Sequence, residues 1–412
     1  MSIVVQKFGG TSVADATKIK NVAQAVIKEK EKGHDVVVVV SAMGKTTDYL
    51  VDLAKEITPK PSLREMDMLL TTGEQVSIAL LTMAIQNAGH KAISMNAAQI
   101  GIITENVHSK ARIVDIKTKK LKKNIEKGFI IVVAGFQGVT EDGEITTLGR
   151  GGSDTSAVAL ASALEAERCD IYTDVDAVFT TDPRIVPTAS RLDTISYEEM
   201  LELARVGANV LHPRSVETAK QFNMPMRVRS SFHHDDLGTL IIGVEDMEIY
   251  RPVSGVAADL SQVKIAITKV PDKPGSAAKI FSTLAAHNVS VDMIIQSYGE
   301  ENNIRDMAFT IDAADLDETM KILNSLQPQI GFEAAIPDEK IAKVSIVGAG
   351  MIDKPGIAAE MFEAIAELGC NIKMISTSEI KISCIIDKDY AKDAVKSLHA
   401  KFELDSDVKI KA

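Results

Sequence analysis

Short apolar runs alternate with amphipathic stretches through the N-terminal part of the chain. The apolar runs are rich in β-branched residues, as buried strands are, and comprise Ile3–Val5, Val36–Val40, Ala92–Met95, Phe129–Ala134 and Cys169–Tyr172. Between them, apolar residues recur with helical spacing over Ala16–Lys30, Glu65–Ala88 and Thr155–Leu164. This alternation predicts an α/β domain at residues 1–245, with a mostly parallel sheet covered by helices on both faces.

The C-terminal part contains an internal repeat. Asp272-Lys273-Pro274-Gly275 recurs as Asp353-Lys354-Pro355-Gly356, and the match continues without a gap through a helix face and the next strand. Each copy predicts the order strand, loop, helix, strand, strand, helix, which places two α+β domains at residues 262–332 and 342–412. A helix that starts after a Pro-Gly turn offers free N–H groups to a carboxylate. Two copies favour a sensor of small molecules, and a purely packing role for the turns is the alternative.

The composition limits the classes of function. The net charge is −11, so we expect no broad basic surface for nucleic acid or anionic lipid. Three widely spaced cysteines form neither a disulfide framework nor a metal cluster. The chain lacks a signal-peptide core at its start, and no apolar stretch approaches the roughly 20 residues that span a membrane. We expect a soluble, cytoplasmic protein that binds neither nucleic acid nor membrane.

The segment Gly149–Asp154 carries the most chemical information. Its three glycines let the backbone approach a ligand closely, and the predicted helix that follows directs free N–H groups toward the loop. Arg150 suits a carboxylate or phosphate, and Asp154 suits an ammonium group. An anion site beside a cation site indicates an amino acid or a nucleotide as ligand. A glycine-rich turn with a capping residue is the alternative interpretation.

A second glycine loop follows the first predicted strand. Lys7-Phe8-Gly9-Gly10 joins this strand to a helix, an arrangement that holds phosphates at the carboxyl edge of a sheet. It differs from the Walker A loop because its lysine precedes the glycines, and it is not a dinucleotide fingerprint. Lys7 is placed as a point charge for phosphoryl oxygens, and a surface lysine is the alternative. We predict no protein-built metal site, so any Mg²⁺ would be held largely by phosphates and water.

Four motifs together resemble the aspartate kinase family, namely Lys7–Ser12, Gly73-Glu74, Gly149–Asp154 and Thr180–Arg184. The two Asp-Lys-Pro-Gly units resemble the paired ferredoxin-like ACT domains that follow the kinase domain in that family, so the resemblance covers nearly the whole chain. It implies an amino-acid-kinase fold and transfer of the ATP γ-phosphate to the β-carboxylate of L-aspartate. The product would be 4-phospho-L-aspartate, the first intermediate toward lysine, threonine and methionine.

The resemblance also assigns residue roles. Lys7 would stabilise the transferring phosphoryl group, and Glu74 would contact aspartate, which makes both of them catalytic candidates. The residues expected at ATP are Lys7, Phe8, Gly9, Gly10, Ser41, Thr173, Asp174, Phe179, Thr180, Thr181, Asp182, Pro183 and Arg184. Those expected at aspartate are Thr47, Glu74, Arg150, Gly151, Gly152, Ser153 and Asp154, with Arg150 on a carboxylate and Asp154 near the ammonium group. The acceptor carboxylate is already ionised at pH 7, so no general base is required.

The same resemblance predicts effector sites where the Pro-Gly loop of one ACT unit meets a strand of another. Lysine is the expected inhibitor, and the intact loop leaves room for threonine acting with it. The candidates are Asp272, Lys273, Pro274, Gly275, Ser276, Ala277, Ser290, Val291, Asp292 and Gln296 in the first unit, and Ile357, Ala358, Asn371, Ile372, Ser378 and Glu379 in the second. ACT units usually pair between chains, which predicts a homo-oligomer, or a hetero-oligomer with a shorter regulatory subunit that starts near Met247.

Two positions depart from the family pattern. Phe179 stands where many members have Tyr, and Asn209 where many have Lys, so contacts to the nucleotide are in doubt at both. Two other functions compete with the aspartate kinase prediction. Acetylglutamate and uridylate kinases lack the paired ACT units, and a non-catalytic amino-acid sensor would be free to lose Lys7, Glu74 and Arg150.

Overall fold

The computed structural model describes residues 2–207, 210–247, 251–297, 303–352 and 354–405; Asn209 and Asp353 of the motifs above lie outside them. The chain folds into two compact units whose segments alternate along the sequence. The first unit comprises Met1–Phe179, Arg191–Arg205 and Asn209–Ile249, and the second comprises Thr180–Ser190, Val206–Ala208 and Tyr250–Ala412.

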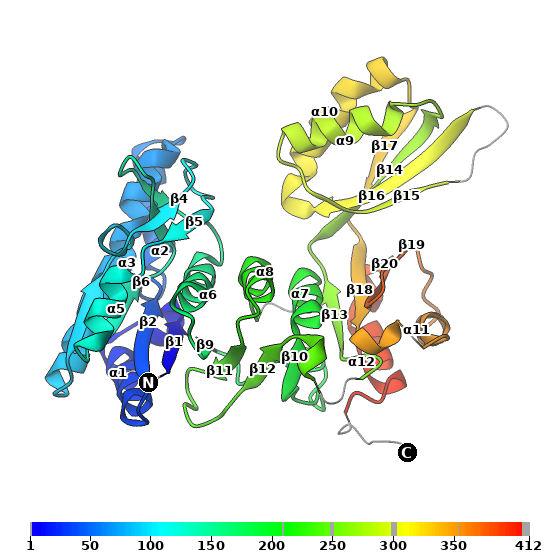
Figure 1. Ribbon diagram of the computed structural model, residues 1–412. Coiled ribbons are helices and arrows are strands. Elements are labelled where there is room, and N and C mark those ends of the chain that lie inside the picture. Colours follow the sequence, from blue (N-terminus) through cyan, green and yellow to red (C-terminus); the bar gives the residue numbers. More distant parts are fainter. Residues whose placement is uncertain (1, 208–209, 248–250, 298–302, 353, 406–412) are drawn as a thin grey trace. The chain divides into compact units, whose positions relative to one another are not determined.

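The first unit is built on an eight-stranded sheet (Figure 1), in the order β10-β12-β11-β9-β1-β2-β6-β3. Its strands are β1 Ile3–Phe8, β2 Asp35–Val40, β3 Ala92–Met95, β6 Ile130–Ala134, β9 Arg168–Thr173, β10 Thr194–Ser196, β11 Met226–Ser230 and β12 Thr239–Ile242. Neighbouring strands are parallel except for the antiparallel pair β11 and β12. In a parallel sheet all the strands end at one edge, so loops far apart in sequence meet there.

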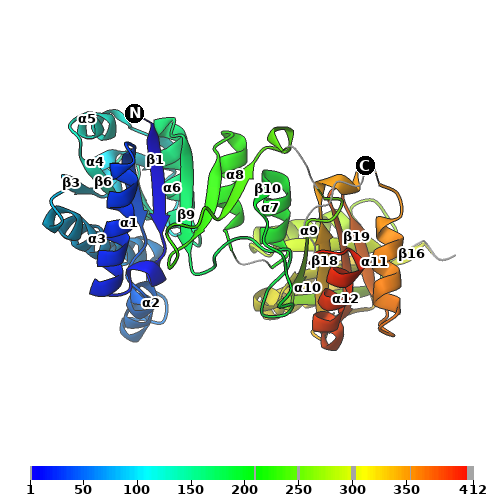
Figure 2. The ribbon, with the colours of Figure 1, turned by 90° about the horizontal axis from the view of Figure 1, so that it is seen from below.

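Helices cover both faces of this sheet, as the alternating pattern predicts. α1 (Ala16–Glu31) packs beside α3 (Leu63–Asn87) on one face, and α6 (Gly152–Leu164) packs beside α8 (Pro213–Gln221) on the other (Figures 1 and 2). The remaining helices of the unit are α2 Thr46–Ile57, α4 Ala97–Ile100, α5 Lys119–Glu126, α7 Tyr197–Arg205, η1 Gly10–Val13 and η2 Val244–Asp246.

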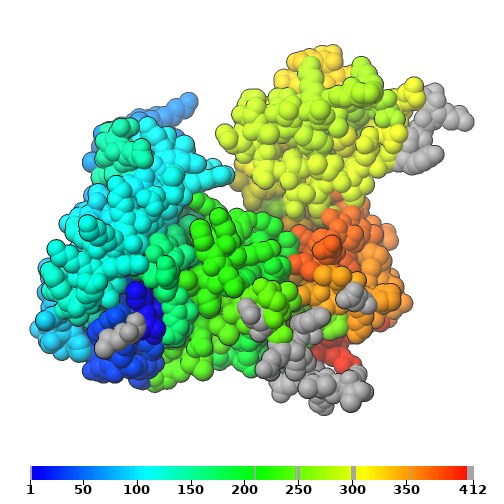
Figure 3. Space-filling model, in the orientation of Figure 1, coloured from blue at the N-terminus to red at the C-terminus, as the bar shows by residue number. Residues whose placement is uncertain are grey.

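The core of this unit follows the two-residue period of its strands. Alternate β2 residues, Val36, Val38 and Val40, form one buried cluster with the apolar faces of α1 and α3. Val37 and Val39 are equally buried, so both sides of β2 are covered. In the space-filling view (Figure 3), blue, cyan and green atoms share the surface of this unit, so segments distant in sequence lie side by side.

A smaller sheet with the order β5-β4-β7-β8 also belongs to the first unit. Its strands are β4 Ile102–Thr104, β5 Ile113–Ile116, β7 Gln137–Val139 and β8 Ile145–Thr147. β8 leads directly into the Gly149–Asp154 loop, so this sheet fixes where that loop begins. β5 is an edge strand.

The second unit contains two four-stranded sheets, ordered β15-β16-β14-β17 and β13-β18-β20-β19. The first consists of β14 Gln262–Pro271, β15 Val291–Gln296, β16 Ile304–Asp312 and β17 Ala334–Asp338, with helices α9 Ser276–Ala286, η3 Ala313–Asp315 and α10 Leu316–Ile330. The second consists of β13 Gly255–Asp259, β18 Ile341–Val347, β19 Met374–Thr377 and β20 Lys381–Asp387, with helices η4 Ala349–Met351, α11 Ile357–Ala366, η5 Lys388–Tyr390 and α12 Ala391–Lys401.

The predicted α/β domain and the two α+β domains are present, but the sheets do not follow the predicted boundaries. β13 precedes the first repeat in sequence and nevertheless pairs antiparallel with β18 of the second repeat. β17 lies beyond residue 332 and completes the first sheet by pairing with β14. Strand pairing joins residues that are remote in sequence, and a repeat pattern does not report it.

Helix α3 bears on the expectation that no apolar stretch is long enough to span a membrane. By length and composition alone, α3 is long and apolar enough to cross a membrane, although 44% of its apolar window is buried inside the protein. It packs against α1 and the main sheet, and it carries buried Asp67 and Glu74. These features are typical of a core helix in a globular unit.

Candidate active site

A cavity of about 1010 Å³ opens in the first unit where β1 and β2 end and α6 begins. All seven residues predicted for aspartate line it, together with Lys7 and Ser41 from the ATP prediction. Gly149 of the predicted loop lines it too, and the further lining residues, which were not predicted, are Asp48, Val51, Leu70, Ser109, Lys110, Arg112, Phe136, Thr147, Leu148, His212 and Arg214. The fold therefore collects loops from across the first unit around one space.

Lys7 and Asp154 face each other across this cavity. The Lys7 Nζ lies 2.6 Å from Asp154 Oδ1, and the two side chains are 12% and 13% exposed. Asp154, which we expected beside a ligand ammonium group, therefore pairs with the protein's own ammonium group. Because Asp154 lies in the first turn of α6, it also lies at the positive end of the helix dipole. Lys7 is thereby held at the start of α6, beside the glycine loop.

Glu74 reaches the cavity because α3 packs closely against the end of β2. A Cβ at Gly73 would lie 2.8 Å from the Ala42 Cβ, so glycine permits this approach. Glu74 is buried, and its Oε1 accepts a hydrogen bond of 3.1 Å from the Ala42 N–H. Burial raises the pKa of Glu74 to about 7 and outweighs the backbone hydrogen bonds that lower it. A cationic ligand group beside Glu74 would favour the ionised form.

The glycine loop adopts a conformation that requires its glycines. Gly149 and Gly151 have φ angles of 77° and 67°, in the left-handed region. A Cβ at Gly151 would lie 2.1 Å from Cγ of His212, so the His212 ring occupies the space beside the loop. Ser153 joins the loop to β2, because the Ser41 hydroxyl donates to its Oγ at 2.9 Å. The loop is thus fixed at Gly151 and in the first turn of α6.

Two residues that the sequence did not indicate brace the start of this loop. The Arg214 guanidinium on α8 donates to the carbonyl oxygens of Leu148, at 2.5 Å, and Ala111, at 3.2 Å. His212 accepts a hydrogen bond of 3.3 Å from the Arg214 N–H at Nδ1, and burial lowers its pKa. A neutral imidazole that accepts at Nδ1 carries its proton on Nε2.

Asp67, on α3, holds two neighbouring segments of the cavity lining. Its carboxylate is fully buried and accepts hydrogen bonds from the Thr147 hydroxyl at 2.6 Å and from the Ser109 N–H at 3.0 Å. His108 Nδ1 lies 2.9 Å from the same carboxylate. A buried carboxylate with several donors fixes the segments that it joins. In sequence Asp67 looks like one more polar helix residue, so pattern analysis passes over it.

Sequence patterns of known protein families match most of this chain. The amino acid kinase family pattern matches residues 2–230, and ACT domain patterns match residues 264–327 and 344–402. Over 404 residues, covering 98% of both chains, the sequence is 53% identical to the aspartokinase of Bacillus sp. strain MGA3. Aspartokinase 2 of Bacillus subtilis strain 168 is similar to the same extent.

The chain belongs to the aspartokinase family. Solved structures of this family support the assignment at the level of the fold. The structure of E. coli aspartokinase III in complex with aspartate and ADP, in its R-state, matches with a TM-score of 0.82 at 28% identity, over 97% of this chain and 99% of that one. The T-state structure of the same enzyme, in complex with lysine and aspartate, matches with a TM-score of 0.78 at 27% identity and the same coverage.

The residues predicted for the nucleotide divide into two groups in this aspartokinase-family chain. Lys7 and Ser41 line the cavity, whereas the other eleven are not among its lining residues. The Phe8 side chain is fully buried and stacks on Tyr172 with ring centroids 4.4 Å apart, so it belongs to the core and leaves its backbone alone for a ligand. Gly10 is needed for packing, since a Cβ there would lie 2.7 Å from the Ala42 carbonyl oxygen.

In the segment Thr180–Arg184, several side chains predicted for the nucleotide have partners within the protein. Thr180 is fully buried within the second unit, where its hydroxyl lies 2.9 Å from His399 Nε2 and donates to the Leu404 carbonyl at 3.3 Å. Thr181 is buried as well, so neither side chain is presented to a ligand. Asp182 instead pairs with exposed Arg184 at 2.8 Å. Pro183 is exposed. At the end of β9, the Thr173 hydroxyl donates a hydrogen bond of 3.1 Å to the Asp174 carboxylate.

The effector candidates lie at the N-termini of α9 and α11 and on or beside β15 and β19. Gly275 and Gly356 precede the two helices with φ angles of 98° and 103°, which explains the glycine in both repeats. Some candidates already have partners: Asp272 lies 2.6 Å from Arg305, and Asp292 lies 2.6 Å from Lys343. Ile357 is buried in the core of the second sheet, so its side chain is a packing residue.

No group of three or more histidine, cysteine or acidic side chains is placed to hold a metal ion in the part of the chain that the structure describes. The cavity instead offers two lysines, three arginines and the amides at the start of α6, which suit anions. Asp48 and Asp154 are its acidic groups besides Glu74. The donor set therefore suits anionic ligand groups.

Proposed function

We propose that this chain transfers the γ-phosphoryl group of ATP to the β-carboxylate of L-aspartate, giving 4-phospho-L-aspartate and ADP. The observation that carries the proposal is the convergence of Lys7, Glu74 and the Gly149–Asp154 loop on one cavity. The E. coli enzyme bound to aspartate and ADP shares this fold, which supports the same pair of ligands here.

The charged residues of the cavity would bind different groups of the two substrates. Both substrates are anions in a chain with a net charge of −11, so positive charge has to be concentrated locally. Lys7 would lie at the transferring phosphoryl group, and Arg150 would hold a carboxylate of aspartate. Glu74, in its ionised form, would accept the substrate ammonium group together with Asp154. The acceptor carboxylate is already ionised at neutral pH, so positioning and charge neutralisation suffice.

We further propose that Mg²⁺ accompanies the ATP, held by its phosphates and by water. The backbone N–H groups of Gly9 and Gly10 and the Ser41 hydroxyl would hold the phosphates, with Thr173, Asp174, Phe179 and Arg184 nearer the nucleoside. The ion would neutralise charge on the phosphates as the acceptor approaches. Lys7 would also neutralise charge on the phosphates, as a group of the protein.

For the second unit we propose feedback inhibition by lysine, alone or with threonine, at the ACT repeats. The T-state structure of the E. coli relative contains lysine, which supports this class of effector. Inhibition requires that lysine bind the inactive state more tightly than the active one. The reaction would open the synthesis of lysine, diaminopimelate, threonine and methionine in the cytoplasm. An oligomer joined through the ACT units, or a partnership with a shorter subunit starting near Met247, belongs to the same proposal.

The test is an ADP-release assay with hydroxylamine as a trap for the acyl phosphate. Aspartyl hydroxamate is expected with aspartate and not with glutamate or N-acetylglutamate. Hydroxamate formed equally well from N-acetylglutamate would point to a different amino acid kinase. ATP turnover without any hydroxamate would contradict carboxyl transfer. Unchanged rates in millimolar lysine and threonine, added singly and together, would contradict the effector proposal.

A further inference from the structure

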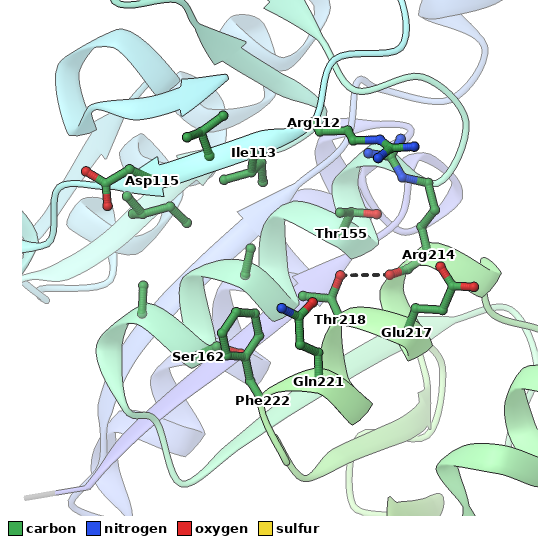
Figure 4. Close-up of a pocket in the computed structure, with 14 residues that line it drawn as sticks. Arg112, Ile113, Asp115, Thr155, Ser162, Arg214, Glu217, Thr218, Gln221 and Phe222 are labelled. Atoms are coloured by element: carbon green, nitrogen blue, oxygen red, sulfur yellow. Dashed lines mark hydrogen bonds between the residues drawn. The ribbon is translucent and has the colours of Figure 1, made fainter. Parts of the chain in front are cut away.

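A second cavity, of about 670 Å³, lies in the first unit between β5, α6 and α8 (Figure 4). Helix α6 lines it with Thr155, Ala159, Ser162 and Ala163, and α8 lines it with Arg214, Glu217, Thr218 and Gln221. Both sets have the three- and four-residue spacing of a single helix face. Arg112, Ile113–Ile116 and Phe222 complete the lining, so three elements build the groove.

One end of this groove is cationic. The guanidinium groups of Arg112 and Arg214 lie beside each other there (Figure 4). Burial, followed by repulsion from Arg112, lowers the pKa of Arg214. Among the residues that the structure describes, no carboxylate lies within ion-pairing distance of either guanidinium, and Glu217 pairs with Arg205 at 2.5 Å. Two adjacent guanidinium groups without a carboxylate partner suit an anionic ligand group.

The other end of the groove presents an aromatic ring among polar and apolar side chains. Phe222 lies there (Figure 4), and its side chain is 56% exposed. Four consecutive β5 residues line the cavity, which places it along the strand edge, since alternate residues point to opposite faces. Val114 on this edge is 66% exposed. A ligand that reached from the arginines to Phe222 would remove apolar surface from water.

We propose that this groove is a binding site for a small organic carboxylate with an apolar tail. Its carboxylate would bind Arg112 and the free N–H groups of Arg214, and its tail would lie along Ala159 and Ala163 toward Phe222. The groove extends beyond the proposed aspartate site, since Thr155, Ala159 and Ala163 line this cavity and not the other.

Occupancy of the groove is coupled to the candidate active site through the two arginines, which line both cavities. Arg214 holds the carbonyl of Leu148, the residue directly before the glycine loop. A carboxylate bound to the free N–H groups of Arg214 pulls on the same guanidinium group that holds this carbonyl. The ligand therefore changes the apparent affinity for aspartate, whose proposed site includes that loop.

Binding is tested with 4-phenylbutyrate as the probe and neutral 4-phenylbutyramide as its matched control. Titration calorimetry of the full-length protein, in saturating aspartate, is expected to show a site for the acid that is roughly ten-fold or more stronger than for the amide. Arg112→Gln should weaken acid binding to a similar extent. Ala163→Leu, which fills the groove from a half-exposed helix position, should abolish it while circular dichroism and basal activity stay unchanged.

Steady-state kinetics are measured on the wild type and on the same variants. In the wild type, 4-phenylbutyrate should change the KM for aspartate, and in Ala163→Leu it should not. Absence of acid binding at millimolar concentration would overturn the proposal. So would equal binding of the amide, or acid binding that survives Ala163→Leu and is displaced by aspartate, which would place the probe in the candidate active site. If Ala163→Leu fails to fold, Ala159→Leu blocks the same groove.

Discussion

At the residue scale, the ion pair between Lys7 and Asp154 concentrates the chemistry of the candidate active site. The pair is largely shielded from solvent, so removing one partner leaves the other charge uncompensated. We therefore expect Lys7→Met to lower kcat by roughly 10²- to 10³-fold, the range seen when one electrostatic contact to a transition state is lost. The hydroxamate assay measures this.

The matched control is Lys30→Met. Lys30 forms an ion pair with Asp35 at 2.7 Å, and neither residue lines the candidate active-site cavity. Its kcat should stay near that of the wild type. Similar losses in both variants would mean that Lys7 acts through stability and not at the reacting group.

The raised pKa of Glu74 predicts that the free energy of unfolding depends on pH. Its folded-state pKa is about 7, above the reference value of 4.5, so the folded state binds the proton more tightly. The stabilisation is fully present below pH 4.5 and is lost as the pH rises through about 7, a change of about 3 kcal/mol at most. Denaturant unfolding at pH 5 and pH 8 should show this loss in the wild type and not in Glu74→Gln. Parallel losses in the two proteins would exclude Glu74 as the titrating group.

At the element scale, the junction of β8, the glycine loop and α6 depends on one close contact. Gly151 combines a left-handed backbone with a His212 ring that leaves no room for a Cβ. Gly151→Ala should raise the KM for aspartate and lower kcat, together by about ten-fold or more in kcat/KM, because the loop has to move off its position.

Gly128→Ala separates backbone strain from this contact. Gly128 has a φ angle of 80°, and an added Cβ would meet nothing within 4 Å. This variant should lose about 1 kcal/mol of stability and keep its activity. Equal effects of the two substitutions on kcat/KM would show that the His212 contact is unimportant.

At the scale of the whole molecule, β13 determines where the second unit can be divided. It pairs with β18 over Gly255–Asp259, and Val256 belongs to the buried cluster of the second sheet. A fragment that starts at Met247 keeps this strand, whereas one that starts at Gln262 exposes the edge of β18. We expect residues 247–412 to fold with a cooperative thermal transition, and residues 262–412 to aggregate or to melt at least several degrees lower.

Circular dichroism melts and size-exclusion chromatography of the two fragments measure this difference. Each fragment retains both Pro-Gly turns, so the comparison isolates the strand. Identical melting of the two fragments would mean that β13 is dispensable. Such a result would also weaken the proposal that a regulatory subunit starts near Met247.

Much of the structure could be predicted from the sequence because it depends on residues that are close together along the chain. The two-residue period of the strands, the helical spacing between them, the Pro-Gly repeats and the loop Gly149–Asp154 each involve neighbouring residues. They were enough to predict the parallel sheet, the two smaller domains and part of the cavity lining. Lys7 stood out because a glycine pair follows it at the end of a strand, whereas the role of Glu74 came from the resemblance to the family.

Tertiary structure decided what depends on residues far apart in sequence. The partner of Asp154, the burial that raises the pKa of Glu74, and the brace from Arg214 to Leu148 arise when distant segments pack. The same holds for β13, which pairs with β18 of the second repeat although it precedes the first repeat in sequence. It also holds for Thr180, whose hydroxyl lies against His399. A hydrogen bond or a desolvated carboxylate is set by what surrounds it in space, and a linear pattern does not contain that information.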